Sequence, residues 1–268
     1  MSATDIGSGA KAPAVELELR GKVLWVRLQR PEVLNAINEE IVEGLSAAVD
    51  RASRKDVRAM VIRGTGRAFC AGADLMEVPG AIIDTARIKA TVERVAAVVE
   101  RIAALPKPVI AGVNGLCAAG GLEIVLACDL VVAVAGARFA DAHSNYGLLP
   151  GAGGSARLPR AVGEPMAKRL MFTGDFVTAE ELAPLGFIAL IVPTDTLDEA
   201  LEALGNSLAA RSPRVMAAMK RLVTAGGDST LNEALRAEDE TLTAYLETPD
   251  VVAGLAAFRQ GKRPTFDD

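Results

Sequence analysis

Two loops rich in glycine and alanine could bring backbone amides close to a ligand. One spans residues 64–75 (GTGRAFCAGADL) and the other residues 114–123 (NGLCAAGGLE). Both follow a short strand-like stretch, and glycine and alanine allow a backbone N–H group to approach another atom closely. A helix beginning near Gly120 would also direct its free N–H groups and its positive dipole end at a developing anion. The pattern favours stabilisation of negative charge by main-chain donors.

Each loop alone has a simpler explanation, because glycine loops after strands more often serve turn geometry than a ligand. Neither loop has Walker or GxGxxG spacing, and the chain contains no GxSxG motif. The sequence therefore indicates neither a phosphate cradle nor a serine nucleophile elbow.

Two side chains could transfer protons. Glu123 follows Leu122 and precedes Ile124, Val125 and Leu126. A solvent-exposed position on a helix would explain this glutamate. A carboxylate among apolar residues is costly, however, unless it has a bonding partner or a catalytic role, and this favours a functional glutamate. His143 is the only histidine in the chain, so a cluster of histidine metal ligands is excluded. An imidazole, with an ordinary pKa of about 6.5, suits a general acid or base, although it could equally line a pocket.

The surrounding sequence predicts an α/β core. Alternating apolar residues predict a hairpin of two strands at 15–19 and 23–28. We expect further strands and helices between residues 38 and 140: strands at 59–63, 109–113, 130–134 and 138–140, and helices at 38–53, 87–105 and 120–127. Strands that alternate with helices favour an α/β fold.

The last quarter of the chain is predicted to be helical. Thr196–Glu199 has the form of a capping box, and Ser212-Pro213 and Thr248-Pro249 are typical helix starts. We expect residues 1–13 to be a loose tail, residues 14–195 to form the core with the site, and residues 196–268 to form a helical region. That region is expected both to cover the core and to contact other subunits.

Composition excludes some classes of protein. The 268 residues carry a formal net charge of −5, which lacks the basic footprint of a nucleic-acid-binding protein. The three cysteines form no CxxC pair. Few, unpaired cysteines are usual in proteins of a reducing compartment. Residues 1–13 have no apolar run, and no stretch approaches the roughly 20 apolar residues needed to cross a bilayer. We expect a cytoplasmic protein without membrane insertion.

Together, and in this order, the motifs resemble those of the crotonase (enoyl-CoA hydratase/isomerase) family. The resemblance runs from Val15 to Phe266. It comprises RPEVLNA at 30–36, AGADL at 71–75, NGLCAAGGLE at 114–123, CDL at 128–130 and PGAGG at 150–154. It implies a spiral of ββα turns with a C-terminal helical trimerisation region, in a homotrimer or a dimer of trimers. It further implies an acyl-CoA substrate, no separate cofactor, no metal, and a place in fatty acid metabolism.

The resemblance also assigns residue roles. It implies that the amides of Ala71 and Gly120 form an oxyanion hole, which holds the thioester oxygen while the α-carbon gains carbanion character. Losing one such donor typically raises a barrier by about 2.7–4 kcal/mol. Hydratases of the family use two glutamates for the water and the proton, and Glu123 matches the first of them.

The second glutamate is missing. Phe139 and the PGAGG segment anchor the alignment without a gap, and its place falls on His143. Asp141 could orient that ring, since strand alternation would put both residues on one face. Gly151 stands where dienoyl-CoA isomerases carry an aspartate, which disfavours that reaction.

Hydration of a 2-enoyl-CoA led by Glu123 is the favoured reaction. The alternatives are a hydrolase, lyase, dehydratase or isomerase that uses Glu123 and His143, or a non-catalytic acyl-CoA-binding protein. Glu123 argues against the last, because a pure binder does not need it. The acyl chain length is left open, although residues 85–99 would border the acyl pocket by analogy.

The resemblance places coenzyme A near the loop at 30–35 and the AGADL segment. Phe258, Lys262 and Phe266 resemble the family segment that closes over the nucleotide, sometimes from a neighbouring subunit. The substrate-binding residues implied in this way are Val33, Ala71, Gly72, Ala73, Asp74, Gly120, Gly151, Phe258 and Lys262.

Overall fold

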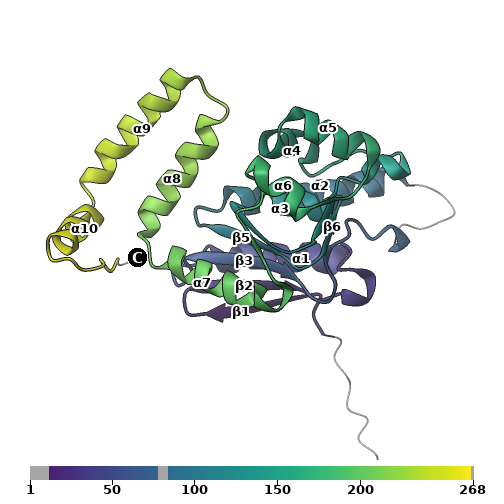
Figure 1. Cartoon of the computed structure of the whole chain (residues 1–268), viewed down its shortest axis with the longest axis horizontal. Helices are drawn as coiled ribbons and strands as arrows, with labels where there is room; N and C mark the ends of the chain where they lie inside the picture. The colour runs from purple at the N-terminus through teal and green to yellow at the C-terminus, as the bar shows by residue number, and fades with distance from the viewer. Residues whose placement is uncertain (1–11, 78–83, 267–268) are drawn as a thin grey trace, which may run out of the picture.

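The chain forms two sheets and ten helices in the part that the computed structural model describes, residues 12–77 and 84–266 (Figure 1). The larger sheet has the order β1-β2-β3-β5-β7-β10, and the smaller has the order β4-β6-β8-β9. The larger sheet consists of β1 (Val15–Arg20), β2 (Val23–Leu28), β3 (Ala59–Gly64), β5 (Val109–Val113), β7 (Leu130–Val134) and β10 (Leu190–Val192). The smaller consists of β4 (Ala68–Cys70), β6 (Leu116–Ala118), β8 (Arg138–Ala140) and β9 (Val177–Thr178).

Chain order and sheet order together describe a spiral. A strand of the large sheet is followed at once by a strand of the small sheet and then by a helix, as in β3-β4-α2, β5-β6-α3 and β7-β8-α4. Within each sheet these successive strands are parallel. This is the predicted spiral of ββα turns, and the β1–β2 hairpin is antiparallel as predicted.

The helices begin where the sequence supplies caps. They are α1 (Glu39–Ala52), α2 (Thr85–Ala104), α3 (Gly120–Leu126), α4 (Gly154–Val162), α5 (Glu164–Thr173), α6 (Ala179–Leu182), α7 (Leu197–Ala209), α8 (Pro213–Gly226), α9 (Leu231–Leu246) and α10 (Pro249–Arg259). The Asn38 side chain accepts from the N–H of Ile41 at the start of α1. Ser212 caps α8 as predicted. The capping box predicted at Thr196 is wrong: its hydroxyl donates to the carbonyl of Pro193 because a 3₁₀ turn precedes α7.

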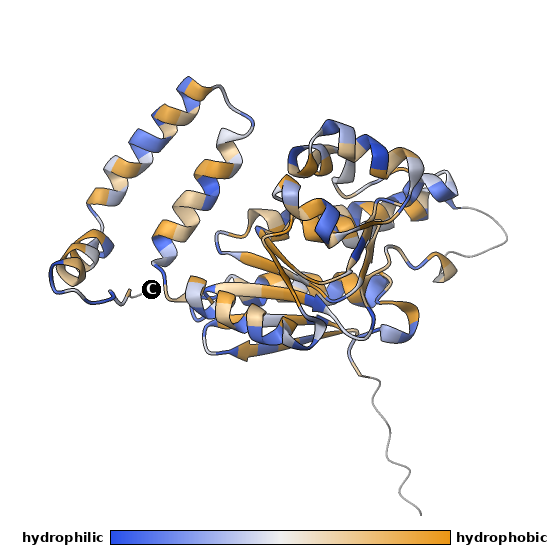
Figure 2. Cartoon of the chain, viewed as in Figure 1, coloured by the Kyte–Doolittle hydropathy of each residue, from blue (hydrophilic) through white to orange (hydrophobic). Residues whose placement is uncertain are grey.

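The core lies between the sheets and the helices of the spiral. Trp25, Phe69 and Phe139 are its largest fully buried side chains. Figure 2 shows the strands of the interior as predominantly apolar, whereas α8 and α9 alternate apolar and polar residues along their length. Helix α7 packs on the large sheet, and Leu201 lies so close to Gly112 that a Cβ there would stand 2.5 Å from its Cδ1. No helix among the described residues is long and apolar enough to cross a bilayer.

The rest of the helical region stands away from the sheets (Figure 1). Helices α8 and α9 pack against each other and bury no residue. Polar contacts tie this C-terminal arm, residues 213–266, to the core. Lys220 pairs with Asp129 at 2.8 Å and donates to the carbonyl of Lys107 at 3.1 Å. Arg160 pairs with Asp228 at 3.0 Å, and Arg58 donates to the carbonyl of Phe266 at 2.6 Å. Residues 196–268 were predicted to cover the core. In the structure mainly α7 does so, because the leucines of α9 are between 52% and 74% exposed.

Candidate active site

Three neighbouring parallel strands end at one edge of the small sheet. Strand β6 lies between β4 and β8 and is parallel to both, with Cys70 opposite Cys117 and Ala118 opposite Ala140. Because parallel strands share their carboxyl edge, the segments that follow them emerge side by side. The segments are residues 71–74, 119–123 and 141–143. The topology therefore gathers the predicted oxyanion loops, Glu123 and His143.

The first loop is fixed by residues 34–37, which run beside it. Asn35 is fully buried, and its side-chain amide donates to the carbonyls of Thr65 and Ala68, at 2.9 Å each. Leu34 and Asn35 both have positive φ values, of 56° and 55°, a conformation that asparagine tolerates better than most residues. The turn directs the Leu34 carbonyl at the first loop.

The same two segments join in a short parallel bridge. The N–H of Ile37 donates to Gly72 at 2.7 Å, and the N–H of Asp74 donates to Ile37 at 2.9 Å. Arg30 adds an ion pair with Asp74 at 2.9 Å, in which both side chains are mostly buried. These contacts hold the backbone from Gly72 to Asp74 in one conformation.

The amide of Ala71 is already used inside the protein. Its N–H donates to the carbonyl of Leu34 at 3.1 Å. One N–H group carries one proton, so the prediction that Ala71 donates to a ligand does not fit this geometry. The N–H of Ala73 makes no hydrogen bond to a described residue, and neither does the N–H of Gly120, which is the first residue of α3. These two amides are the available donors.

Ala73 and Gly120 lie close together. A Cβ added at Gly120 would stand 3.8 Å from the nitrogen of Ala73, and a Cβ added at Gly72 would stand 3.4 Å from the nitrogen of Gly120. Gly72 also has a φ of +100°, so a side chain is excluded there both by conformation and by space. The two N–H groups thus form a compact pair that side chains would obstruct.

Helix α3 begins through a strained residue. Ala119 has φ 48° and ψ −121°, and its N–H donates to the carbonyl of Ala140 on the neighbouring strand at 3.1 Å. Among the described residues, the non-glycine residues with positive φ are Leu34, Asn35, Ala119 and Ala142. All four lie in the segments that build this site. Strain of about 1–3 kcal/mol per residue persists only where the surrounding structure imposes it, which supports a functional site here.

Glu123 is a buried carboxylate, 4% exposed, anchored by one oxygen. Its Oε1 accepts from the N–H groups of Ala152 and Gly154, at 2.7 and 2.8 Å. Gly154 begins α4, so the carboxylate also lies at the positive end of a helix. A Cβ at Gly154 would stand 2.9 Å from Cβ of Pro150 and 3.2 Å from Oε1, and these two contacts explain the glycine. Oε2 makes no hydrogen bond to a described residue, so it is the oxygen available for chemistry.

His143 is paired with a second buried carboxylate. Its Nδ1 lies 3.0 Å from Oδ1 of Asp141, and the two side chains are 12% and 3% exposed. Burial lowers the pKa of His143, but the hydrogen bond and charge of Asp141, together with the charge of Glu123, outweigh it and leave the pKa above its ordinary value. Glu123 and His143 follow the neighbouring parallel strands β6 and β8, and the charge of Glu123 contributes to this shift. The two predicted acid–base side chains therefore belong to one site.

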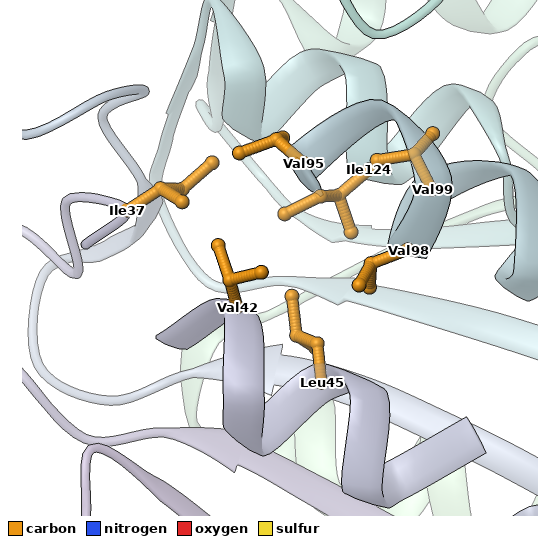
Figure 3. Close-up of a pocket in the computed structure, with 7 residues that line it drawn as sticks. All are labelled: Ile37, Val42, Leu45, Val95, Val98, Val99 and Ile124. Atoms are coloured by element: carbon orange, nitrogen blue, oxygen red, sulfur yellow. The ribbon is translucent and has the colours of Figure 1, made fainter. Parts of the chain in front are cut away.

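The loop that contains Gly151 lies against α2. Gly151 faces α2, where a Cβ would stand 2.3 Å from Cγ1 of Val92, so α2 does border the PGAGG loop. A small apolar cavity has a volume of about 10 Å³. Figure 3 shows the side chains that line it: Ile37, Val42, Leu45, Val95, Val98, Val99 and Ile124. That volume holds at most one water molecule. The cavity is therefore too small to hold a substrate.

The remaining predicted residues lie away from the two amides, Glu123 and His143. Val33 is partly exposed beside the first loop. Phe258 is 83% exposed on α10, and α10 lies on the opposite side of the molecule from α3 and α4 (Figure 1). Phe258 and Lys262 are therefore not brought to the site of their own chain. The segment expected to border the acyl pocket, residues 85–99, adjoins residues 78–83, which lie outside the described residues.

Three contributions to the site were missed in the sequence. These are the free amide of Ala73, the N–H donors of Ala152 and Gly154, and the anchor Asn35. The glycines of PGAGG were a usable sign of the second, because glycine before a helix often marks a close approach of the backbone to another group. Nothing local to the AGADL segment distinguishes the amide of Ala71 from that of Ala73.

Comparison with known proteins gives one consistent result. Residues 18–268 match the family profile described as enoyl-CoA hydratase/isomerase. The 2,3-dehydroadipyl-CoA hydratase of Escherichia coli (strain K12) is 35% identical over 251 residues, which cover 91% of this chain and 95% of that protein. The probable mitochondrial enoyl-CoA hydratase of Dictyostelium discoideum is 32% identical over 250 residues, covering 93% and 89%.

Solved structures agree with the spiral fold. The enoyl-CoA hydratase from Bacillus anthracis superposes with a TM-score of 0.90 at 29% identity, covering 94% of this chain and 98% of that one. An enoyl-CoA hydratase of Mycobacterium smegmatis gives a TM-score of 0.88 at 31% identity, with coverages of 94% and 98%. The similarity spans both the sheets and the C-terminal helices.

Proposed function

Because the chain belongs to the enoyl-CoA hydratase/isomerase family, we propose that it is an enoyl-CoA hydratase that adds water to the double bond of a 2-enoyl-CoA thioester. The observation that carries the proposal is the pair of free amides, Ala73 and Gly120, beside a buried carboxylate, Glu123, with one unused oxygen. The donors suit a thioester oxygen and the carboxylate suits a water molecule, which are the two groups that hydration must hold.

The amides supply the electrostatic part of the mechanism. When water adds to C3 of the acyl chain, negative charge moves through C2 to the thioester oxygen. Two N–H groups fixed in advance stabilise that charge without reorganisation, and one such donor is typically worth about 2.7–4 kcal/mol of barrier. The proposed pair is Ala73 and Gly120, with Ala73 taking the role predicted for Ala71.

Glu123 is proposed as the principal acid–base group. Oε1 is fixed by Ala152 and Gly154, so Oε2 can accept a proton from water in a defined direction. His143 lies in the same site and replaces the carboxylate that family hydratases carry there. It is available as a second acid–base group in hydration or in a related reaction of the family.

The proposed assembly follows from the exposed arm. Helices α8 to α10 leave apolar side chains such as Leu231, Val252 and Phe258 more than two-thirds exposed. We propose a homotrimer or a dimer of trimers in which these helices are covered by other subunits. Phe258 and Lys262 would then reach the coenzyme A of a neighbouring site, while Val33 and residues 71–74 bind it within the chain.

An activity screen tests the reaction. The purified protein is assayed on 2-enoyl-CoA thioesters of graded chain length, with 3-enoyl and 3-hydroxyacyl thioesters alongside. We expect reversible hydration of at least one 2-enoyl-CoA. Turnover of only the 3-enoyl esters would assign an isomerase, and tight binding without turnover of any ester would assign a binding protein.

A complex with a bound acyl-CoA tests the oxyanion assignment separately. We expect the thioester oxygen within about 3.2 Å of the nitrogens of Ala73 and Gly120. An oxygen more than about 4 Å from both nitrogens would overturn the assignment, whichever reaction follows.

A further inference from the structure

We infer that Asp141 is a positioning residue, which holds the Nδ1–H of His143 so that Nε2 delivers a proton to the substrate while Glu123 takes the proton of water. The inference rests on the proposed function. It assigns one of the two proton transfers of hydration to Glu123 and the other to His143.

The geometry fixes which nitrogen faces the carboxylate. Oδ1 of Asp141 lies 3.0 Å from Nδ1 of His143. An ionised carboxylate can only accept hydrogen bonds, so Nδ1 is the donor and keeps its hydrogen. Ala142, at φ 59°, forms the turn that brings the side chains of residues 141 and 143 together immediately after β8. The pairing is therefore built into the backbone.

The balance of charge gives His143 its role. Asp141 and Glu123 are both buried, and within the described ranges neither carboxylate pairs with a lysine or an arginine. A buried carboxylate without a counter-charge is costly. Two other cations lie near these loops, but Arg30 pairs with Asp74 and Arg157 pairs with Glu100. Among the described residues, the imidazole is therefore the group placed to supply a positive charge to Asp141. A protonated ring balances the charge of Asp141 through a hydrogen bond and the charge of Glu123 through space. In the resting site, protonated His143 is then the acid and ionised Glu123 the base.

Charges from neighbouring elements do not change this balance. Helix α5 packs against the turn that contains His143, and its charged side chains point to solvent. There Lys168 pairs with Glu164, and Arg169 pairs with Glu181. The charges that act on the ring are those of Asp141 and Glu123, which raise the pKa of His143 against the lowering effect of burial.

The proton transfers balance over one turnover. Oε2 of Glu123 takes a proton from water as the water oxygen bonds to C3, and the π electrons move through C2 to the thioester oxygen. Nε2–H of His143 then gives its proton to C2, and the thioester carbonyl re-forms. Glu123 is left protonated and His143 neutral, and a proton passing from the first to the second restores the site. In dehydration every step runs in reverse.

The sole histidine makes the inference measurable without an activity assay. Tag-free protein with ¹⁵N-labelled histidine is titrated by NMR, and its ring signals report His143 alone. We expect the parent to titrate above the ordinary imidazole value and its neutral form to carry hydrogen on Nδ1. A neutral form with hydrogen on Nε2 would overturn the inference, and this result needs no variant.

The variant Asp141→Asn removes the charge but keeps the shape. We expect the His143 titration to move to lower pH, because burial still lowers its pKa while the main opposing charge is gone. The high-pH limb of kcat should move in the same direction, with KM unchanged because Asp141 touches no substrate. Above that limb kcat should fall by up to the about 10²–10⁴-fold that general acid–base catalysis contributes.

A matched control makes the same change elsewhere. Asp195 is exposed and follows β10 at the edge of the other sheet, so Asp195→Asn should leave both the titration and the limb in place. If Asp141→Asn also left both unchanged, Asp141 would have no positioning role. If the NMR results were as expected but no enoyl-CoA were hydrated, the pairing would stand and the proposed function would fail.

Discussion

Glu123→Gln separates the chemical role of this side chain from its structural one. Glutamine has the volume of glutamate, and its single Oε1 can accept from both Ala152 and Gly154 as the carboxylate does. Its amide group then takes the position of Oε2, where it cannot accept a proton. The substitution should preserve the fold of the site and remove its base.

The expected cost in stability is small. Hydrogen bonds to a charged group contribute about 1.5–3 kcal/mol and neutral ones about 0.5–1.5 kcal/mol, so the two bonds together lose about 2–3 kcal/mol. Removal of a buried charge acts in the opposite direction, which keeps the net loss below that figure. Glu123→Ala is the contrasting variant. It leaves two buried N–H groups without an acceptor, at about 1–3 kcal/mol each.

The expected cost in rate is large. Loss of a general acid–base group lowers kcat by about 10²–10⁴-fold, which corresponds to about 2.7–5.4 kcal/mol of barrier. Affinity for acyl-CoA, measured by calorimetry, should be nearly unchanged, because the amides of Ala73 and Gly120 are intact. Urea unfolding and steady-state kinetics on the same preparation supply the two numbers. Full hydratase activity in Glu123→Gln would refute the assignment of the base.

Four further expectations concern the same structure. Gly154→Ala should displace the Glu123 carboxylate by a few tenths of an ångström. It should lower kcat by about three- to tenfold, since 1 Å of misplacement can cost about 10²-fold. Steady-state kinetics with unchanged acyl-CoA affinity would confirm this. Asn35→Ala should lower the free energy of unfolding by about 2–5 kcal/mol in urea, because buried carbonyls lose their donor and alanine disfavours the positive φ. Sedimentation at micromolar concentration should give a trimer or larger, and a stable monomer would remove the proposed role of α8 to α10. The pKa of His143 is raised in the folded state. The contribution of its protonation to the free energy of unfolding should therefore be complete below about pH 6.5 and should be lost as pH rises through the folded pKa. Urea unfolding of the parent and of His143→Gln at several pH values should show a difference in stability that shrinks over this range.

Much of the architecture could be predicted from the sequence because each element carries its own local pattern. Strands β5, β7 and β8 were predicted with their observed bounds, since short apolar runs between glycine and proline residues have few other structures available. The start of α3 at Gly120 was predicted from the glycines that precede an apolar helical run. Local pattern and tertiary structure agree at these places.

The details of the site were less predictable because they depend on contacts distant in sequence. The donor role was expected at Ala71, but a carbonyl 37 residues earlier, that of Leu34, takes its proton. Ala119 and Ala142 adopt positive φ values that alanine avoids in isolation, so no local rule could predict the turns they make. Thr196 has the sequence of a capping box, yet the preceding 3₁₀ turn directs its hydroxyl elsewhere.

The spiral also determines when the site can exist during folding. Each of three successive turns contributes one of the loops at the edge of β4, β6 and β8. A fourth segment, residues 152–154 at the start of α4, supplies the N–H groups that fix Glu123. Parallel pairing joins residues far apart in the chain and is slow to form. A chain folded only as far as α3 would carry both amides and the carboxylate but would lack the groups that anchor it. Recovery of activity on refolding should therefore follow the recovery of helical structure, and it reports completion of the third turn.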